Sequence, residues 1–149
     1  MMCMLGKRAQ HGVSMTARLR PRLTPVNRFY WEAGRDGVLK ILRCRACGTW
    51  IFPAQPVCRA CHGEDVAPEA VSGTGTIYSI TINHQAWVPG LETPYVIARV
   101  ALDGVEGVLL TTNITGDGAL DGAIGDRVEV RFEEQDGIWF PLFTLARKD

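Results

Sequence analysis

Four cysteines in the first half of the chain have the spacing of a metal site. They form two Cys-x-x-Cys pairs, Cys44 with Cys47 and Cys58 with Cys61, and ten residues separate the pairs. A Cys-x-x-Cys loop is short enough for both thiolates to reach one ion, and two such loops complete the tetrahedral four-sulfur shell that Zn²⁺ prefers. We therefore predict a structural Zn²⁺ ion at these residues, in a closed shell that leaves no position for substrate.

Two other chemistries use the same cysteines. The run Cys58-Arg59-Ala60-Cys61-His62 also matches the c-type haem attachment pattern, and either pair alone matches a redox dithiol. Haem attachment needs an exported chain, and the basic residues 1–22 are not followed by the apolar segment of a secretory signal. A disulfide is disfavoured because nothing in the sequence marks an oxidising compartment. Both alternatives stay open beside zinc, whereas Cys3 lies too far from the pairs to join them.

An apolar stripe ahead of the first cysteine predicts a short helix within residues 24–37. Thr24 can cap it, and Pro25 suits the first helical position, where a missing N–H is no loss. Gly34 and Gly37 supply a stop and a turn. The stripe repeats at i, i+3, i+4 and i+7 and consists of Val26, Phe29, Tyr30 and Ala33.

The cysteine pairs lie in a second segment, residues 38–70, whose strand and turn signals predict a β-ribbon. Residues 38–43 form a strand that leads into the first cysteine loop, and residues 50–52 form the return strand. Gly48 fits a tight turn that points backbone N–H groups at thiolate sulfur. We expect this ribbon to fold around the metal.

The second half of the chain, residues 71–149, contains short strands separated by Gly and Pro. Five strands in one compact unit favour a closed or partly closed barrel, because closure hides the sheet edges. We predict an OB-type barrel, with a five-stranded sandwich or an open meander as the alternative. Asp136-Gly137 is a strong hairpin signal. The expected strands are residues 76–83, 95–102, 107–113, 127–133 and 138–145.

Charge divides between the two halves, although the formal net charge is zero. Residues 1–71 carry 11 Lys and Arg against 5 Asp and Glu, a balance of +6, and residues 72–149 carry 5 against 11, a balance of −6. This asymmetry indicates separate partner surfaces or a favourable contact between the halves. Residues 1–23 are basic and lack acidic groups, so we expect a flexible arm. With no apolar run near 18 residues, we expect no membrane span and a cytoplasmic location.

The helix, ribbon and barrel carry short motifs in a fixed order. These motifs are Phe29-Tyr30-Trp31-Glu32-Ala33, Arg43-Cys44-x-x-Cys47-Gly48 with Phe52-Pro53, Cys58-x-x-Cys61, Gly73-x-Gly75-x-Ile77-Tyr78-Ser79, Pro94-Tyr95-Val96-Ile97-Ala98, Ile124-Gly125-Asp126-x-Val128 and Pro141-x-Phe143. Over residues 24–147 they resemble the zinc-ribbon plus OB-fold family long catalogued as a domain of unknown function and described as acyl-CoA-associated. His62 departs from the pattern, since many zinc knuckles carry a small residue there.

The resemblance implies a rubredoxin-like zinc ribbon, an OB-fold barrel and a structural Zn²⁺ ion. It also implies an accessory subunit with no catalytic residue of its own. The implied ligand is acyl-CoA or a related thioester. The implied partners are thiolases, thiolase-like lipid-transfer proteins that act as aldolases, and hydratases of the MaoC type.

Several residues are candidates for holding such a thioester. The phosphates of CoA favour the positive half of the chain, and the acyl and pantetheine portions need an apolar groove. The loop of residues 84–93 is long enough to reach into a partner's active site. The candidate ligand-binding residues are Arg28, Trp31, Arg43, Arg45, Trp87 and Tyr95.

Nucleic-acid binding is the alternative function, because zinc ribbons and OB barrels are common in proteins of that class. The −6 balance of the barrel half opposes it, since an OB groove that follows a phosphate backbone needs a basic track. Independent catalysis by His84 is a further alternative. No serine elbow, phosphate-binding loop or His-Glu metal motif accompanies that histidine.

Overall fold

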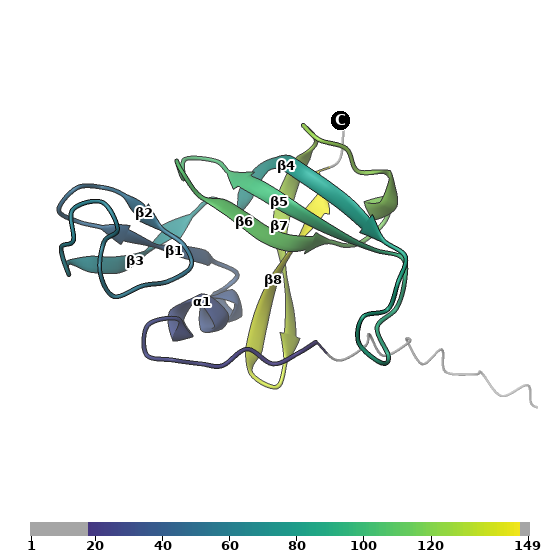
Figure 1. Cartoon of the computed structure of the whole chain (residues 1–149), viewed down its shortest axis with the longest axis horizontal. Coiled ribbons are helices and arrows are strands. Elements are labelled where there is room, and N and C mark those ends of the chain that lie inside the picture. The colour runs from purple at the N-terminus through teal and green to yellow at the C-terminus, as the bar shows by residue number, and fades with distance from the viewer. Residues whose placement is uncertain (1–17, 147–149) are drawn as a thin grey trace, which may run out of the picture.

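A computed structural model describes residues 18–146, in which a small β-sheet adjoins a closed β-barrel (Figure 1). Cys3 and residues 1–17 of the predicted arm lie outside the described residues. The small sheet has the antiparallel order β2-β1-β3, with β1 Leu39–Cys44, β2 Trp50–Ile51 and β3 Val66–Val71. The barrel has the order β4-β5-β6-β8-β7, with β4 Thr74–Asn83, β5 Tyr95–Leu102, β6 Leu109–Ile114, β7 Arg127–Gln135 and β8 Ile138–Leu145.

The helical region is shorter than the predicted residues 24–37. The α-helix α1 covers Arg28–Glu32, and the 3₁₀ turn η1 continues it over Ala33–Asp36. Thr24 caps a turn that precedes α1: the N–H of Asn27 donates to Thr24 Oγ1 at 3.3 Å, and the N–H of Thr24 donates to Asn27 Oδ1 at 2.8 Å. The left-handed Gly37, with φ of 69°, ends the segment as its type predicts.

The strand β3 was not predicted. It pairs with the whole length of β1, from Leu39 opposite Val71 to Cys44 opposite Val66. None of its side chains is fully buried, three of the six are exposed, and Pro68 lies in its middle, so the sequence lacks the apolar alternation that marks a strand. Proline is tolerated there because β3 is an edge strand of the small sheet.

The five predicted barrel strands are all present, and the barrel is closed. Asp136 and Gly137 turn β7 into β8 with positive φ angles of 52° and 79°, which is the geometry expected of a two-residue hairpin loop. The closing contact between β6 and β8 is short and parallel. It consists of the register pair Ile114 and Phe143, extended by a hydrogen bond from the N–H of Thr115 to the carbonyl oxygen of Phe143 at 2.8 Å.

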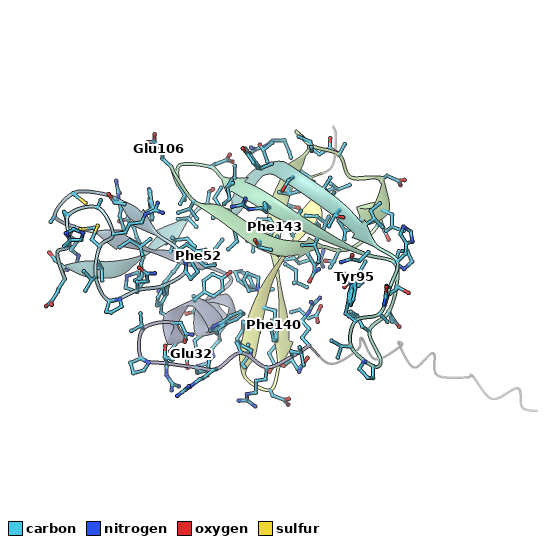
Figure 2. All side chains as sticks on the ribbon, in the orientation of Figure 1. Glu32, Phe52, Tyr95, Glu106, Phe140 and Phe143 are labelled. Carbon is cyan, nitrogen blue, oxygen red and sulfur yellow. The ribbon has the colours of Figure 1, made fainter. Side chains whose placement is uncertain are left out.

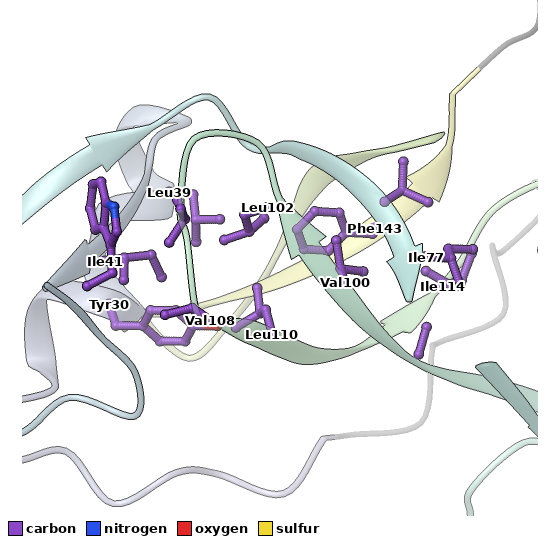
Figure 3. Packing of buried hydrophobic residues seen from close by; sticks show 14 of the residues in the cluster. Tyr30, Leu39, Ile41, Ile77, Val100, Leu102, Val108, Leu110, Ile114 and Phe143 are labelled. Carbon is purple, nitrogen blue, oxygen red and sulfur yellow. The ribbon is translucent and has the colours of Figure 1, made fainter. Parts of the chain in front are cut away.

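One hydrophobic core crosses the junction between the small sheet and the barrel. Leu39 and Ile41 of β1 belong to the same buried cluster as Val100, Leu110 and Phe143 of the barrel (Figure 3). A smaller cluster on the other face of β1 contains Leu42, Cys44, Ile51 and Cys58. The two units are therefore joined by continuous apolar packing, while the cysteine end of the ribbon has only a minor core of its own.

Tight packing around Gly34 also holds η1 against the hairpin of β7 and β8. A Cβ atom on Gly34 would lie 2.5 Å from Phe132 Cδ1 and 2.6 Å from Trp139 Cβ, so no larger residue fits there without a shift. A second contact joins the cysteine loop to the barrel, since Arg59 Nη2 donates to the carbonyl oxygen of Gly107 at 3.3 Å. Glycine at position 34 is thus required by packing, while Gly37 makes the turn.

Candidate functional site

The four predicted metal-ligating cysteines converge at the far end of the ribbon from the barrel. Their sulfur atoms all lie within 4.8 Å of one another, with Cys44 Sγ 3.6 Å from Cys61 Sγ and Cys47 Sγ 3.6 Å from Cys58 Sγ. Tetrahedral zinc with Zn–S bonds of about 2.3 Å places its sulfurs about 3.8 Å apart. The donor set therefore fits Zn²⁺. Convergence of four thiols favours a metal over the dithiol and haem alternatives.

Two matching turns present these sulfurs. The N–H of Gly48 donates to the carbonyl of Cys44, and the N–H of His62 donates to the carbonyl of Cys58, each at 2.9 Å. Both residues have left-handed backbones, with φ of 77° at Gly48 and 60° at His62. Glycine adopts this conformation without strain, whereas a histidine pays a steric penalty. The His62 departure seen in the sequence thus coincides with the one strained backbone position in the described cysteine loops.

The pKa values of the thiols show why the cluster needs a cation. The hydroxyl and N–H of Thr49 lower the pKa of Cys47 to about 6, and N–H groups of the second loop lower that of Cys58. Although the N–H of Gly63 acts to lower it, the neighbouring Cys44 and Cys47 raise the pKa of Cys61 to about 11. Thiolates so close together repel one another, and a bound Zn²⁺ relieves that repulsion while the N–H groups hold the sulfurs in place.

The predicted ligand-binding arginines of the ribbon have partners of their own. Arg43 stacks on Trp50, with its guanidinium carbon 4.8 Å from the ring centre, and forms an ion pair with Glu69 at 3.0 Å. Arg45 is more exposed, and its nearest carboxylate, that of Asp65, is 3.8 Å away. Of the two, Arg45 is the one with a guanidinium available for a phosphate.

The two predicted residues of α1 have different surroundings, since Arg28 is exposed and Trp31 packs against other rings. Arg28 forms an i,i+4 ion pair with Glu32 at 3.3 Å. Trp31 packs edge-on against Tyr30 and Phe140, with ring centres 4.9 and 5.6 Å apart. Burial raises the pKa of the Tyr30 hydroxyl well above its ordinary value. Trp31 thus fills the interface between α1 and β8.

The two predicted residues of the barrel lie away from the ribbon. Tyr95 begins β5 at the end of the barrel opposite the cysteine sulfurs (Figure 2). Trp87 lies in the loop between β4 and β5 and is 68% exposed. The structure thus brings the four cysteines together but does not gather the six predicted ligand-binding residues into one site.

Sequence reasoning missed a pocket of about 600 Å³ at the Tyr95 end of the barrel. It lies between the β4–β5 loop, the segment after β6 and the beginning of the described chain. No local sequence signal marks it, because Arg18, Asn113 and Phe140 on its wall are far apart in the chain. Its apolar walls include Leu19, Val88, Leu91, Pro94, Leu120 and Phe140.

The fold and the cysteine cluster define a zinc ribbon joined to an OB barrel, and comparisons with known proteins agree. The family profile of the ChsH2 rubredoxin-like zinc ribbon domain matches residues 31–67, and that of the ChsH2 C-terminal OB-fold domain matches residues 68–133. With the converging sulfurs, these matches confirm the predicted Zn²⁺ cofactor and the fold.

Named relatives occur in bacteria and archaea. The chain is 39% identical over 130 residues to a Thermomonospora curvata protein named "Probable enoyl-CoA hydratase alpha subunit". It is 30% identical over 129 residues to the 3-oxo-4,17-pregnadiene-20-carboxyl-CoA hydratase alpha subunit of Mycobacterium tuberculosis. Each match covers 87% of this chain but only 40% and 39% of those relatives. A Methanocaldococcus jannaschii DUF35 domain-containing scaffold protein is 34% identical over 64% of this chain and 70% of its own length.

Two solved structures share this fold. The chain superimposes with a TM-score of 0.76 and 35% identity on a chain of the structure "Ltp2-ChsH2(DUF35) aldolase", covering 86% of this chain and all of that one. A DUF35 protein from Sulfolobus solfataricus shares the fold, with a TM-score of 0.59 at 17% identity. The chain belongs to the DUF35 family of ChsH2-type zinc-ribbon and OB-fold proteins.

Proposed function

We propose that this chain is a non-catalytic accessory subunit that partners an acyl-CoA-processing enzyme, either a MaoC-type hydratase or a thiolase-like aldolase of the lipid-transfer type. The main support is the likeness along the whole of a chain in the Ltp2-ChsH2(DUF35) aldolase structure. The scaffold name of the archaeal relative and the alpha-subunit names of the bacterial relatives point the same way. The proposal places the complex in the cytoplasm. Within residues 18–146, no helix is both long and apolar enough to cross a bilayer.

The finer part of the proposal is that the subunit also binds the acyl-CoA thioester. Two of the relatives are named for enzymes whose substrates are CoA thioesters. On this chain the exposed Arg45 supplies a positive group for a CoA phosphate beside the rigid metal site. The apolar portion of the thioester requires a separate, uncharged surface.

The partner contact is proposed to involve the loop between β4 and β5. This loop carries Trp87, a large aromatic side chain that is 68% exposed, followed by Val88 at 37%. Exposed aromatic residues of this kind commonly anchor protein interfaces. A loop that projects from a rigid barrel is also suited to reach a partner's active site, as the sequence predicted.

Co-purification tests the accessory role. The chain is expressed with a tagged hydratase or thiolase-like subunit from its own genome, and each is assayed for turnover alone and together. We expect a stable complex, no turnover by this chain alone, and loss of complex with Trp87→Ala but not with Tyr78→Ala, a control whose side chain is also exposed at 59%. A chain that binds no such enzyme but shifts a labelled oligonucleotide at physiological salt would establish the nucleic-acid alternative instead.

Calorimetry tests the thioester. We expect CoA to bind the zinc-loaded complex and Arg45→Glu to weaken that binding at least threefold, because the reversal places a carboxylate where a phosphate is proposed. Arg99→Glu on the barrel is the matched control for net charge. Equal affinity of the Arg45 variant and the wild type would remove the ribbon from the CoA site.

A further inference from the structure

We propose that the pocket at the Tyr95 end of the barrel binds the uncharged, apolar body of an acyl group. Tyr95 and the cysteine sulfurs lie at opposite ends of the molecule, so this is a site distinct from the phosphate contact proposed at Arg45 (Figure 2). Its volume of about 600 Å³ lies within the range of about 300–1,000 Å³ that small-molecule sites occupy. The proposal rests on the proposed function only for the identity of the ligand as a thioester. The pocket and its chemistry stand on the geometry alone.

The charge on the pocket wall is already neutralised. Arg18 is the only cation among the described lining residues, and its side chain is 23% exposed. Its Nε donates to Glu133 Oε1 at 3.1 Å, its Nη1 donates to Asn113 Oδ1 at 3.0 Å, and its guanidinium carbon lies 5.9 Å from the ring centre of Phe140. The Glu133 carboxylate balances the charge of this guanidinium, and Glu133 and Asn113 already use two of its five N–H donors, so the wall favours an anionic ligand less than an unpaired arginine would.

The polar atoms beneath the surface are also paired. Asn113 Nδ2 donates to the carbonyl of Val96 at 2.8 Å, and the backbone N–H of Arg18 donates to Gln135 Oε1 at 2.8 Å. Gln135 Nε2 in turn donates to the carbonyl of Arg18 at 3.1 Å. These bonds hold Arg18 and Leu19 against the barrel as one wall of the pocket. What the wall presents to a ligand is therefore mainly hydrocarbon, with the Tyr95 ring at one edge.

Exposed apolar side chains at the opening of the pocket also support an apolar ligand. Leu19 is 76% exposed, Leu120 is 47% exposed and Val88 is 37% exposed, and all three line the pocket. Apolar groups left in water around a concave site gain free energy when an apolar body covers them, at about 25 cal/mol per Å². Glu92 is the only acidic lining residue of the described chain, and it further disfavours phosphate.

A fluorescence assay on the full-length zinc-loaded protein tests this. N-phenyl-1-naphthylamine, an uncharged apolar probe whose emission rises when it leaves water, should bind and should be displaced by decanoyl-CoA but not by CoA at equal concentration. Leu120→Glu should weaken probe binding at least fivefold, because it places a carboxylate at the opening. Ile124→Glu is the matched control, since Ile124 is 69% exposed, lies four residues away and does not line the pocket.

Three results would overturn the proposal. The first is no probe binding by the wild type. The second is an equal effect of the Leu120 and Ile124 substitutions. The third is a Leu120→Glu variant that keeps probe binding but loses its partner enzyme, which would make the pocket a protein-docking surface. Failure to co-purify any enzyme would instead contradict the accessory role and leave the probe result standing.

Discussion

The ribbon and the barrel are stabilised in different ways. The barrel encloses large buried side chains such as Phe143, Leu110 and Ile77, each at most 1% exposed. The cysteine end of the ribbon has only Leu42 and Ile51 buried beside two of its four sulfurs, Cys44 and Cys58. A core of that size cannot offset the conformational entropy of the loops, so the ribbon depends on its metal and the barrel on apolar burial. We therefore expect the cysteine end of the ribbon to respond to zinc and the barrel not to.

Loss of the metal should produce the largest difference in stability between the ribbon and the barrel. Apparent zinc-binding free energies of structural sites are about 10–16 kcal/mol at pH 7, and this energy is folding energy for the ribbon. We expect Cys58→Ser, or a strong chelator, to abolish stoichiometric zinc and to expose amides of residues 42–61 to rapid hydrogen exchange, while the strands of the barrel stay protected. Cys3→Ser is the control and should retain one zinc per chain. Simultaneous loss of protection in both units would show that they do not differ in this way.

A cavity in the barrel core should destabilise the barrel and leave the zinc-bound ribbon unchanged. Phe143 is fully buried, and truncation of such a phenylalanine to alanine costs about 3–5 kcal/mol. Phe143→Ala should lower the free energy of unfolding of the barrel by that amount in a denaturant titration, with zinc content unchanged. Tyr78→Ala, at an exposed position, should change it by less than about 0.5 kcal/mol. Zinc loss from the Phe143 variant would contradict independent stabilisation of the ribbon.

The two matching turns of the ribbon can also be compared, with a smaller expected effect on stability. His62→Gly removes left-handed strain and should stabilise the zinc-bound ribbon by about 0.5–1 kcal/mol, after the entropy cost of glycine is subtracted. Gly48→Ala introduces strain at the equivalent position and should destabilise it by about 1 kcal/mol. Competition with a chromogenic chelator measures both. A weaker zinc affinity for His62→Gly would mean that the histidine side chain itself supports the site.

The smallest effect concerns an exposed ion pair on the barrel. Arg127 Nη1 donates to Asp103 Oδ1 at 2.8 Å, and the Asp103 carboxylate also accepts from Thr74. These bonds lower the pKa of Asp103 from 3.8 to about 2. Because the folded pKa lies below the ordinary one, the pair stabilises the fold above about pH 4, and this contribution is lost as the pH falls toward 2.

An NMR titration that follows the Asp103 carboxyl group measures this pKa. The Asp103 midpoint should lie near pH 2 and should rise toward 3.8 in Arg127→Ala. The effect on global stability should be slight, since exposed pairs contribute little. A midpoint that does not move in the variant would assign the shift to Thr74.

Prediction from the sequence succeeded where a local pattern of residues determines the structure. The cysteine spacing predicted the zinc cluster, and the alternation of residues in β7 with the Asp136-Gly137 turn predicted the last hairpin. The edge strand β3 was missed because its exposed residues and Pro68 carry no strand pattern; pairing with β1 determines it.

The pocket could not be predicted because it is assembled from distant segments. The Arg18 to Gln135 bonds join residues 117 positions apart, and no periodicity encodes them. Trp31 was predicted as a ligand contact in an apolar groove between the helix and the barrel, and in the structure its ring packs against Phe140 of β8. The six ligand-binding residues remain predictions, with Arg45 and Trp87 the most accessible of them.

The short contact between β6 and β8 bears on how the pocket could change shape. The β4–β5, β5–β6 and β7–β8 pairs are long hydrogen-bonded ladders, but here closure depends on Ile114, Thr115 and Phe143. Ile114, Thr115 and Gly116 also form one wall of the pocket. Local opening at this contact breaks few bonds, so we expect its amides to exchange by a smaller fluctuation than those of the β4–β5 pair. We therefore expect the width of the pocket to vary through partial opening at this one contact, while the zinc-held ribbon stays intact.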